Sequence, residues 1–269
     1  MTAVRHAETT TAPGTVPSRR VVGLAGGTVV TAWVIGLTGL VGPTLVASAL
    51  GLAVLVLAWG WAGTLALPTP RGTVAVLLLG GAAIVLSVAL RAEPPWLTWL
   101  PAALAVSMIL AFGHQLLRRD GRPRVADSVT SVLFGLAVLT SGIFAIPLSR
   151  TDPGSALLVA AVAAAGASSL TDLASTRAAL RPWTTPAALL AGAAAAVVTA
   201  ALTEQPWGVF LLVGVTSGGV SHVARAVFGT LPPLAHARPR LVASLTSVLI
   251  VLVLPYVAAL GLLPEALPR

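Results

Sequence analysis

The sequence predicts an all-α fold, a polytopic transmembrane helix bundle of about nine spans with a cytoplasmic N-terminus. Of its 269 residues 57% are hydrophobic and only 9% are charged, whereas a soluble domain has about 25% charged residues. The charges stand in short groups between long uncharged runs, and most of these runs have the ~20 residues that one membrane-spanning helix needs. This hydrophobicity also excludes a disordered chain. The absence of cysteine excludes disulfides, thiolate metal sites and cysteine nucleophiles.

The first uncharged run, 21–70, is long enough for two spans. A helix rises 1.5 Å per residue, so the run would extend about 75 Å, roughly twice a 30 Å hydrocarbon core with a turn. Gly42-Pro43 lies near its middle and supplies a break, because proline cannot continue a helix. We therefore expect spans over 21–41 and 44–67.

The other seven spans follow the remaining uncharged runs. Each run has 19 to 24 residues and therefore fits a single helix across the bilayer. Turn signals rich in proline and glycine fall between the runs. The runs cover 72–90, 94–117, 128–149, 153–171, 182–203, 205–224 and 241–264.

The distribution of arginine, the one basic residue besides histidine, predicts the orientation. With the N-terminus inside, thirteen arginines fall in cytoplasmic segments and only Arg91, Arg150 and Arg269 fall outside. This is the asymmetry of the positive-inside rule. The net charge of +8 therefore indicates membrane topology, not binding to nucleic acid. We expect a multi-pass protein of the inner (plasma) membrane with membrane lipids as partners.

Three segments are expected: a disordered cytoplasmic tail at 1–20, a transmembrane domain at 21–264 and a short extracytoplasmic tail at 265–269. A cleaved signal peptide is the alternative for the N-terminus, with Ala47-Ser48-Ala49 as its cleavage site. That triplet lies inside continuing apolar sequence, and the run before it exceeds the roughly 7–15 apolar residues of a signal peptide. We expect the first helix to be retained.

Small residues are expected to hold the spans together. Apolar side chains gain little by leaving lipid for one another, so close backbone packing must contribute more. Gly214 and Gly218 lie four residues apart on one helix face, and the spans 153–171 and 182–203 are rich in alanine. We expect both alanine-rich spans inside the bundle. The codon bias of a GC-rich genome is the alternative source of the alanines.

Polar residues inside apolar spans are the best functional pointers in a membrane protein. Asp172 lies at the cytoplasmic end of the sixth span, and Ser221, His222 and Arg225 lie in the cytoplasmic half of the eighth. Ser221 and Arg225 are one helical turn apart and share a face. His236 follows in the next loop. These five residues predict a cytoplasm-facing recess with a cationic mouth, suited to an anionic lipid headgroup.

Three of these residues also have structural interpretations. Arg225 could extend its guanidinium to the lipid headgroups, and His222 could bond to a neighbouring helix. A carboxylate inside a span is costly unless it is paired or hydrated. Arg177 and Arg181 are the nearest basic residues in sequence that could pair with Asp172.

Signatures of an enzyme are missing from the sequence. It has no closely spaced acids, no zinc-type histidine pair and no phosphate-binding loop. Asp127 is expected to be the N-cap of a helix beside Arg124. Mg²⁺ chemistry needs carboxylate ligands, and Asp172 is the only acid well inside a predicted span. We expect no catalytic residues, no metal and no cofactor.

Three segments carry a resemblance to a known family. Residues 124–129 read Arg-Val-Ala-Asp-Ser-Val and lead into a span followed by Thr-Asp-Pro-Gly at 151–154. Residues 168–172 read Ser-Ser-Leu-Thr-Asp, and 221–225 read Ser-His-Val-Ala-Arg before a Pro-rich loop containing His236. Over about 140 C-terminal residues, the chain thus resembles the phosphatidate cytidylyltransferases (CDP-diacylglycerol synthases).

The chain departs from the catalytic signature of that family. The signature reads Ser-x-x-Lys-Arg, then Lys-Asp, Pro-Gly-His-Gly-Gly, Asp-Arg and a further Asp. Ser221, Arg225 and His236 match it, but Ala224 replaces the lysine, and Thr and Leu at 230–231 replace Lys-Asp. The later aspartates also lack counterparts. The resemblance therefore implies the multi-helix fold, the cytoplasmic recess and a homodimer or another membrane-protein partner, without the carboxylates that the activity needs.

We favour a non-catalytic cytidylyltransferase-like protein that binds an anionic lipid or a membrane partner through the recess. The first alternative is an active CTP-dependent enzyme of phospholipid synthesis with a rearranged site around Asp172, His222 and Arg225. The second is a small-solute transporter, which the lack of a half-to-half repeat and the odd number of spans disfavour.

Overall fold

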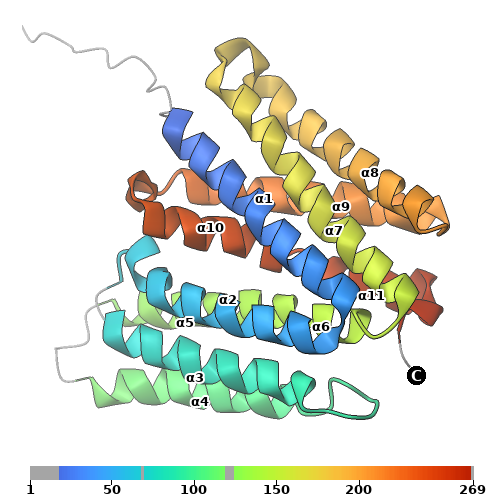
Figure 1. Ribbon diagram of the computed structural model, residues 1–269. Helices are drawn as coiled ribbons and strands as arrows, with labels where there is room; N and C mark the ends of the chain where they lie inside the picture. Colours follow the sequence, from blue (N-terminus) through green and yellow to red (C-terminus); the bar gives the residue numbers. More distant parts are fainter. Residues whose placement is uncertain (1–17, 68–69, 119–123, 268–269) are drawn as a thin grey trace, which may run out of the picture.

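The computed structural model describes residues 18–67, 70–118 and 124–267 (Figure 1). Across these ranges it contains helices and no strand, and nine segments are long and apolar enough to cross a membrane. The prediction of an all-α, multi-pass bundle is confirmed. The spans are Arg19–Val41, Pro43–Thr64, Pro70–Ala89, Leu100–Leu117, Val125–Leu148, Asp152–Thr176, Ala178–Leu202, Trp207–Gly229 and Ala237–Leu262.

The described residues contain eleven α-helices and four short 3-10 helices. The α-helices are α1 Ser18–Val41, α2 Pro43–Thr64, α3 Pro70–Ala89, α4 Leu100–Leu117, α5 Val125–Ile143, α6 Ala145–Leu148, α7 Asp152–Thr171, α8 Thr184–Leu202, α9 Trp207–Gly229, α10 Ala237–Leu249 and α11 Val253–Leu262. The 3-10 helices are η1 Asp172–Thr176, η2 Ala178–Trp183, η3 Pro232–Ala235 and η4 Pro264–Ala266.

The two expected tails lie only partly within the described residues. Helix α1 begins at Ser18, inside the expected tail 1–20, and residues 1–17 lie outside the described part. The expected C-terminal tail 265–269 contains the end of η4, and residues 268–269 lie outside the described part.

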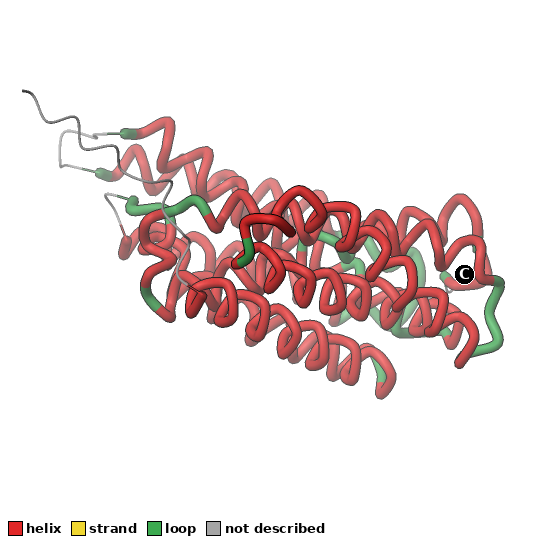
Figure 2. Tube along the Cα trace, turned by 90° about the horizontal axis from the view of Figure 1, so that it is seen from above, coloured by secondary structure: helices red, strands yellow, loops and turns green. Residues whose placement is uncertain are grey.

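The helices form two groups joined by the last span (Figure 1). Helices α2, α3, α4 and α5 pack together, and α7 packs with α1, α8 and α9. Helix α10 lies between the groups and contacts α1, α2 and α9. Seen from above, the long helices run roughly along one direction and the connecting loops lie mainly at the two ends (Figure 2). This is the arrangement that a bilayer requires, because loops inside lipid would expose backbone polar groups.

Proline interrupts two spans that the uncharged runs predict to be continuous. Pro147 in α6 and Pro255 in α11 lack the N–H that would bond the carbonyl four residues earlier. The chain breaks at Phe144 between α5 and α6 and at 250–252 between α10 and α11. The rings of Phe144 and Tyr256 lie 4.7 Å apart, so the two interrupted spans contact each other near their breaks.

Glycine brings the backbones of α8 and α9 into contact. A Cβ added at Gly192 would lie 2.5 Å from the carbonyl oxygen of Gly214 and 3.0 Å from the Cα of Gly218. Such an approach is possible only where both helices lack side chains, as the spacing of small residues predicts.

The two alanine-rich spans occupy different environments. Helix α7 is enclosed by α1, α8 and α9, as predicted. Helix α8 lies on the outside of the bundle, where Leu190 and Leu202 are 71% and 80% exposed. The prediction of an interior position is therefore wrong for α8. The small residues Ala188, Gly192 and Ala196 are buried in the bundle, and the larger apolar residues of α8 are free to face lipid.

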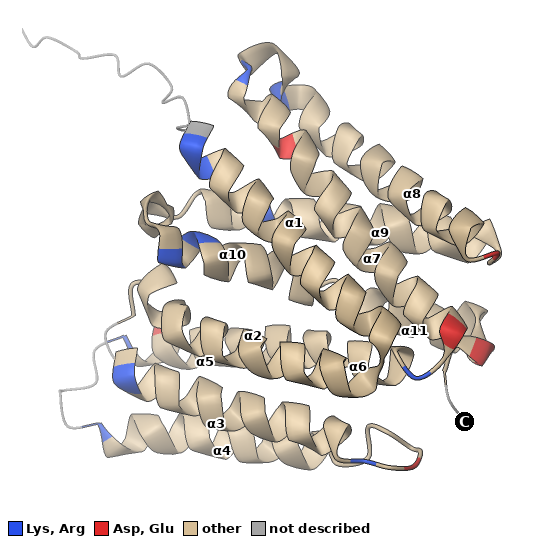
Figure 3. Cartoon of the chain, in the orientation of Figure 1, with Lys and Arg blue, Asp and Glu red and all other residues tan. Residues whose placement is uncertain are grey.

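Charges of opposite sign gather at opposite ends of the helices (Figure 3). We call one the basic end, where the described arginines are Arg19, Arg20, Arg71, Arg118, Arg124, Arg177, Arg181, Arg225, Arg238 and Arg240. The other is the acidic end, with Glu93, Asp152, Glu204 and Glu265 together with Arg91 and Arg150. Residue 122 and its neighbours at 119–123 lie outside the described part.

The N-terminus of α5 differs from the expectation. Arg124, not Asp127, occupies the N-cap and has a left-handed φ of 53°. Asp127 lies in the first turn, where its Oδ2 accepts a hydrogen bond from Arg124 Nε at 2.8 Å. The expected pairing with Arg124 is confirmed, but the capping role is wrong because the helix starts two residues before Asp127. A carboxylate in the first turn still interacts favourably with the helix dipole.

Candidate functional site

Four of the five candidate residues meet at the basic end. Asp172 lies directly after α7, as its C-cap and the first residue of η1. Ser221, His222 and Arg225 lie on the buried face of α9, which packs against α7. Ser221 and Arg225 are four residues apart and therefore share one face of α9.

The carboxylate of Asp172 joins two residues of α9. Its Oδ2 accepts a hydrogen bond from Arg225 Nε at 2.5 Å, and its Oδ1 lies 2.7 Å from His222 Nδ1. A carboxylate can only accept, so Nδ1 carries the proton of this hydrogen bond. The Asp172 side chain is 16% exposed and that of Arg225 is 1% exposed. The ion pair is therefore almost fully enclosed by protein and shielded from water and lipid.

The remaining nitrogens of Arg225 bind two serines. Nη1 donates to Ser221 Oγ at 2.6 Å, and Nη2 donates to Ser168 Oγ on α7 at 3.1 Å. All three guanidinium nitrogens are thus engaged inside the protein. The alternative that Arg225 extends to the lipid headgroups is wrong. Its side chain turns inward because Asp172 and two hydroxyls offer charge-assisted hydrogen bonds there.

His222 connects this network to α8. Its Nε2 lies 3.2 Å from the Thr185 hydroxyl in the first turn of α8. The expectation of a bond from His222 to a neighbouring helix is therefore confirmed. We call Ser168, Asp172, Thr185, Ser221, His222 and Arg225 the polar cluster. Nothing in the sequence singles out Thr185, because one threonine at the start of a span is common and its partner is distant in the chain.

The suggested partners of Asp172 lie elsewhere. Arg177 and Arg181 are both exposed in the η1–η2 segment. Arg181 Nε donates to the backbone carbonyl of Ser175 at 3.0 Å. The predicted pairing of Asp172 with Arg177 or Arg181 is therefore wrong. Helix α9 packs against α7 and places the Arg225 guanidinium on the Asp172 carboxylate instead.

His236 stands apart from the other candidates. It is exposed at the N-cap of α10, and its Nδ1 lies 3.4 Å from the carbonyl oxygen of Pro233. Within the described residues it makes no hydrogen bond to the polar cluster. The structure therefore unites four of the five predicted site residues.

The polar cluster is closed. Both oxygens of Asp172, both ring nitrogens of His222 and all three guanidinium nitrogens of Arg225 have partners within the protein. Ser217, one turn before Ser221 in α9, is buried, and its hydroxyl has no partner in the described structure. In the described part of the chain no three His, Cys, Asp or Glu residues are grouped so that they could hold a metal ion.

The fold and the cluster define a multi-pass, all-α membrane protein in which a buried carboxylate–guanidinium–imidazole network ties three spans together at one end. Comparisons with protein families, with curated proteins and with solved structures find no match.

Proposed function

We propose that this chain is a non-catalytic multi-pass protein of the inner (plasma) membrane that binds anionic lipid headgroups at its basic end, on the cytoplasmic side. One observation carries the proposal. The two described carboxylates of the basic end, Asp127 and Asp172, already pair with Arg124 and Arg225. Seven other arginines there have no carboxylate within 4.0 Å among the described residues: Arg19, Arg20, Arg71, Arg177, Arg181, Arg238 and Arg240.

Phosphate is the chemistry that suits this surface. A guanidinium binds phosphate oxygens with two parallel hydrogen bonds, and each basic residue near an anionic leaflet contributes about 1 kcal/mol of attraction. Arg177 and Arg181 follow Asp172 by five and nine positions. The closed polar cluster then has a scaffolding role, because it fixes the start of the η1–η2 segment that carries these two arginines.

The resemblance to phosphatidate cytidylyltransferases supports the same ligand class. Enzymes of that family act on an anionic phospholipid at the cytoplasmic face. The carboxylates that would hold Mg²⁺ in that family lack counterparts in this sequence. A protein that binds the headgroup without transferring a nucleotide accounts for both features.

Native mass spectrometry of the purified full chain tests the proposal. The protein is mixed with equal amounts of phosphatidylglycerol and phosphatidylcholine that carry the same acyl chains. We expect preferential retention of phosphatidylglycerol, reduced in the variant Arg177→Gln/Arg181→Gln/Arg238→Gln/Arg240→Gln. The control Arg124→Gln/Asp127→Asn removes a paired arginine at the same end and should retain the preference. An unchanged preference in the fourfold variant would contradict the proposal.

An active phospholipid-synthesis enzyme remains the second candidate. The short contact between Asp172 and His222 favours it, because an imidazole oriented by a carboxylate is a common general base. Purified protein would be assayed with CTP, Mg²⁺ and phosphatidic acid. Turnover that disappears in Asp172→Asn, in protein that remains folded, would replace the non-catalytic proposal with this one.

A further inference from the structure

Two arginines interrupt the acidic end. Arg91 follows α3, and Arg150 lies between α6 and α7. Neither has a carboxylate within 4.0 Å among the described residues. Arg150 Nη2 donates to the Arg91 carbonyl oxygen at 3.3 Å, and its guanidinium carbon lies 3.7 Å from the ring centre of Trp96. These contacts hold the Arg150 side chain beside the backbone of Arg91.

Two hydrogen-bond donors at this place lack an acceptor. Arg150 Nε and Trp96 Nε1 are buried, and neither has a hydrogen-bond partner in the described structure. A buried N–H without a partner is costly, and such groups are rare in native proteins. Burial also lowers the pKa of the Arg150 guanidinium, because desolvation disfavours the charged form. The site therefore offers positive charge and hydrogen-bond donors that suit an anion.

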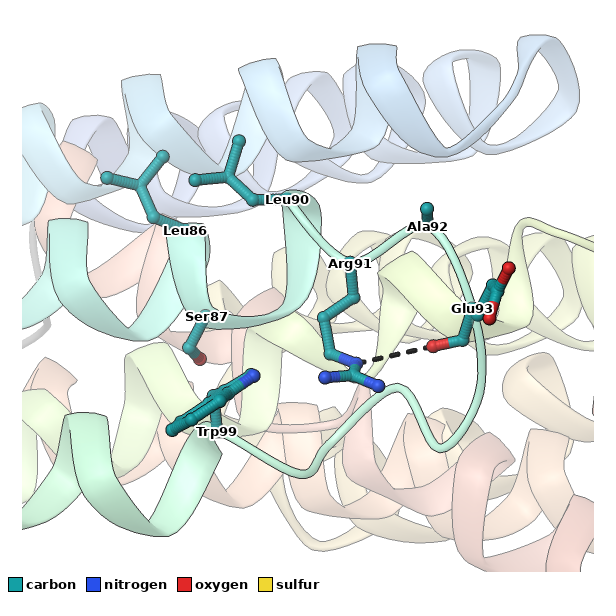
Figure 4. A pocket seen from close by; sticks show the side chains of 7 residues that line it. All are labelled: Leu86, Ser87, Leu90, Arg91, Ala92, Glu93 and Trp99. Atoms are coloured by element: carbon teal, nitrogen blue, oxygen red, sulfur yellow. Dashed lines mark hydrogen bonds between the residues drawn. The ribbon is translucent and has the colours of Figure 1, made fainter.

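An apolar trough opens beside these arginines. It has a volume of about 950 Å³, runs between α2 and α3, and has Arg91 and Arg150 among its lining residues. A second hollow of about 550 Å³ adjoins it, and Leu86, Leu90 and Arg91 line both. Figure 4 shows the second hollow, where the Arg91 side chain points into the loop between α3 and α4 and its Nε donates to the Glu93 backbone carbonyl at 3.2 Å. The Glu93 carboxylate itself does not neutralise Arg91.

The length of the trough matches one leaflet of a bilayer. Its α2 wall extends from Pro43 to Leu55, which corresponds to roughly 18 Å of helix at 1.5 Å per residue. Half of a 30 Å hydrocarbon core is about 15 Å. An acyl chain that starts at the acidic end would therefore fill the trough and end near the middle of the membrane.

We propose that the trough between α2 and α3 binds an anionic lipid, with its acyl chain against Gly51 and its phosphate or carboxylate headgroup on Arg91 and Arg150. The anion compensates two arginines that line the trough and have no carboxylate within 4.0 Å among the described residues, and it offers an acceptor to the buried Nε of Arg150. A purely structural role for Arg150, holding the loop after α3 through the Arg91 carbonyl and Trp96, is simpler, but it leaves the buried Nε of Arg150 without an acceptor. This site lies at the opposite end from the basic-end surface and does not depend on the function proposed there.

Two kinds of variant separate the headgroup from the acyl chain. Arg91→Gln/Arg150→Gln removes the charges and leaves hydrogen-bonding side chains. Gly51→Phe fills the trough, and a Cβ at Gly51 has no atom within 4 Å, so the backbone need not shift. Gly63→Phe is the matched control, because Gly63 lies on the same helix, is equally open and does not line the trough.

The binding of phosphatidylglycerol and phosphatidylcholine with identical acyl chains is measured by native mass spectrometry on the full chain. The measurement is repeated with the four arginines 177, 181, 238 and 240 already replaced by glutamine, so that the two ends are distinguished. We expect about tenfold weaker phosphatidylglycerol binding in Gly51→Phe and in the double arginine variant, and no change in Gly63→Phe. Thermal unfolding checks that each variant is folded, and Arg91→Gln alone replaces the double variant if that variant is not.

Three results would overturn the proposal. The first is equal binding of both lipids in the protein whose arginines 177, 181, 238 and 240 are replaced by glutamine. The second is binding that excess inorganic phosphate abolishes and Gly51→Phe leaves intact, since a free anion would then be the ligand. The third is a dimer that Gly51→Phe dissociates, since a helix of a second copy would then cover the trough.

Discussion

Arg225 on α9 and Asp172 at the end of α7 form an ion pair with a Nε–Oδ2 distance of 2.5 Å, although 53 residues separate them in sequence. Their side chains are 1% and 16% exposed. Removing two charges from water is expensive, and attraction repays this only when geometry and further hydrogen bonds are favourable. Ser168, Ser221 and His222 supply these hydrogen bonds, so the pair depends on its whole surroundings.

Breaking this pair from one side should destabilise the protein strongly. Asp172→Ala leaves a buried guanidinium without compensation, at a cost of about 3–5 kcal/mol. The double variant Asp172→Ala/Arg225→Met should lose less than the sum of the single variants, because no charge stays buried. Unfolding in detergent micelles measures the double-mutant cycle. The exposed pair is the control: Asp127→Ala should cost at most about 1 kcal/mol. Equal losses for Asp127→Ala and Asp172→Ala would contradict the prediction.

The contact between α8 and α9 should not tolerate even one methyl group. Gly192→Ala places a Cβ 2.5 Å from the Gly214 carbonyl oxygen and must push the helices apart. Overpacking of this kind costs about 1–3 kcal/mol. Gly208→Ala lies in α9 with open space around its Cβ and should be neutral or stabilising by up to about 1 kcal/mol. Thermal unfolding of the two variants compares them directly, and the prediction is wrong if their midpoints fall together.

The natural absence of cysteine permits a labelling test of topology. Glu93→Cys and Asp152→Cys at the acidic end should react with a membrane-impermeant maleimide added outside intact cells. Arg181→Cys at the basic end should react only after the membrane is opened, as should Arg122→Cys, whose position lies outside the described residues. The expectation follows from the retention of arginine-rich loops in the cytoplasm. Labelling of Arg181→Cys in intact cells would reverse the orientation.

Trp61 should be the most important aromatic residue of the core. It is fully buried, its Nε1 donates to the Ser131 backbone carbonyl at 2.9 Å, and its ring packs against Phe134 and Phe228. Trp61→Phe removes this hydrogen bond and leaves a void where the larger indole packed, and it should cost about 1–3 kcal/mol. Trp33 is 65% exposed, so Trp33→Phe should be close to neutral. Unfolding monitored by circular dichroism compares the two, and a larger loss for Trp33→Phe would refute the assignment.

Part of the polar cluster is predictable from helical spacing alone. Ser221 and Arg225 are four residues apart, so they must share a face, and a carboxylate inside a span must find a partner. Spacing along one helix gives no information about which face of another helix it meets. The packing of α7 against α9 decides that Asp172 pairs with Arg225 and not with Arg177, which is nearer in sequence. Thr185 joins the cluster only because α8 packs beside α9.

Hydrophobicity and charge along the chain determined by themselves how many times it crosses a membrane and which loops lie together. Both follow from a local cost, that of placing a charge or an open backbone in hydrocarbon. Tertiary structure alone decided that Arg225 is sealed inside the protein, that α8 faces outward, and that Arg150 meets Trp96 beside an apolar trough. These three features depend on contacts between segments that are distant in sequence. The free energy of such contacts is gained only when the helices pack against each other.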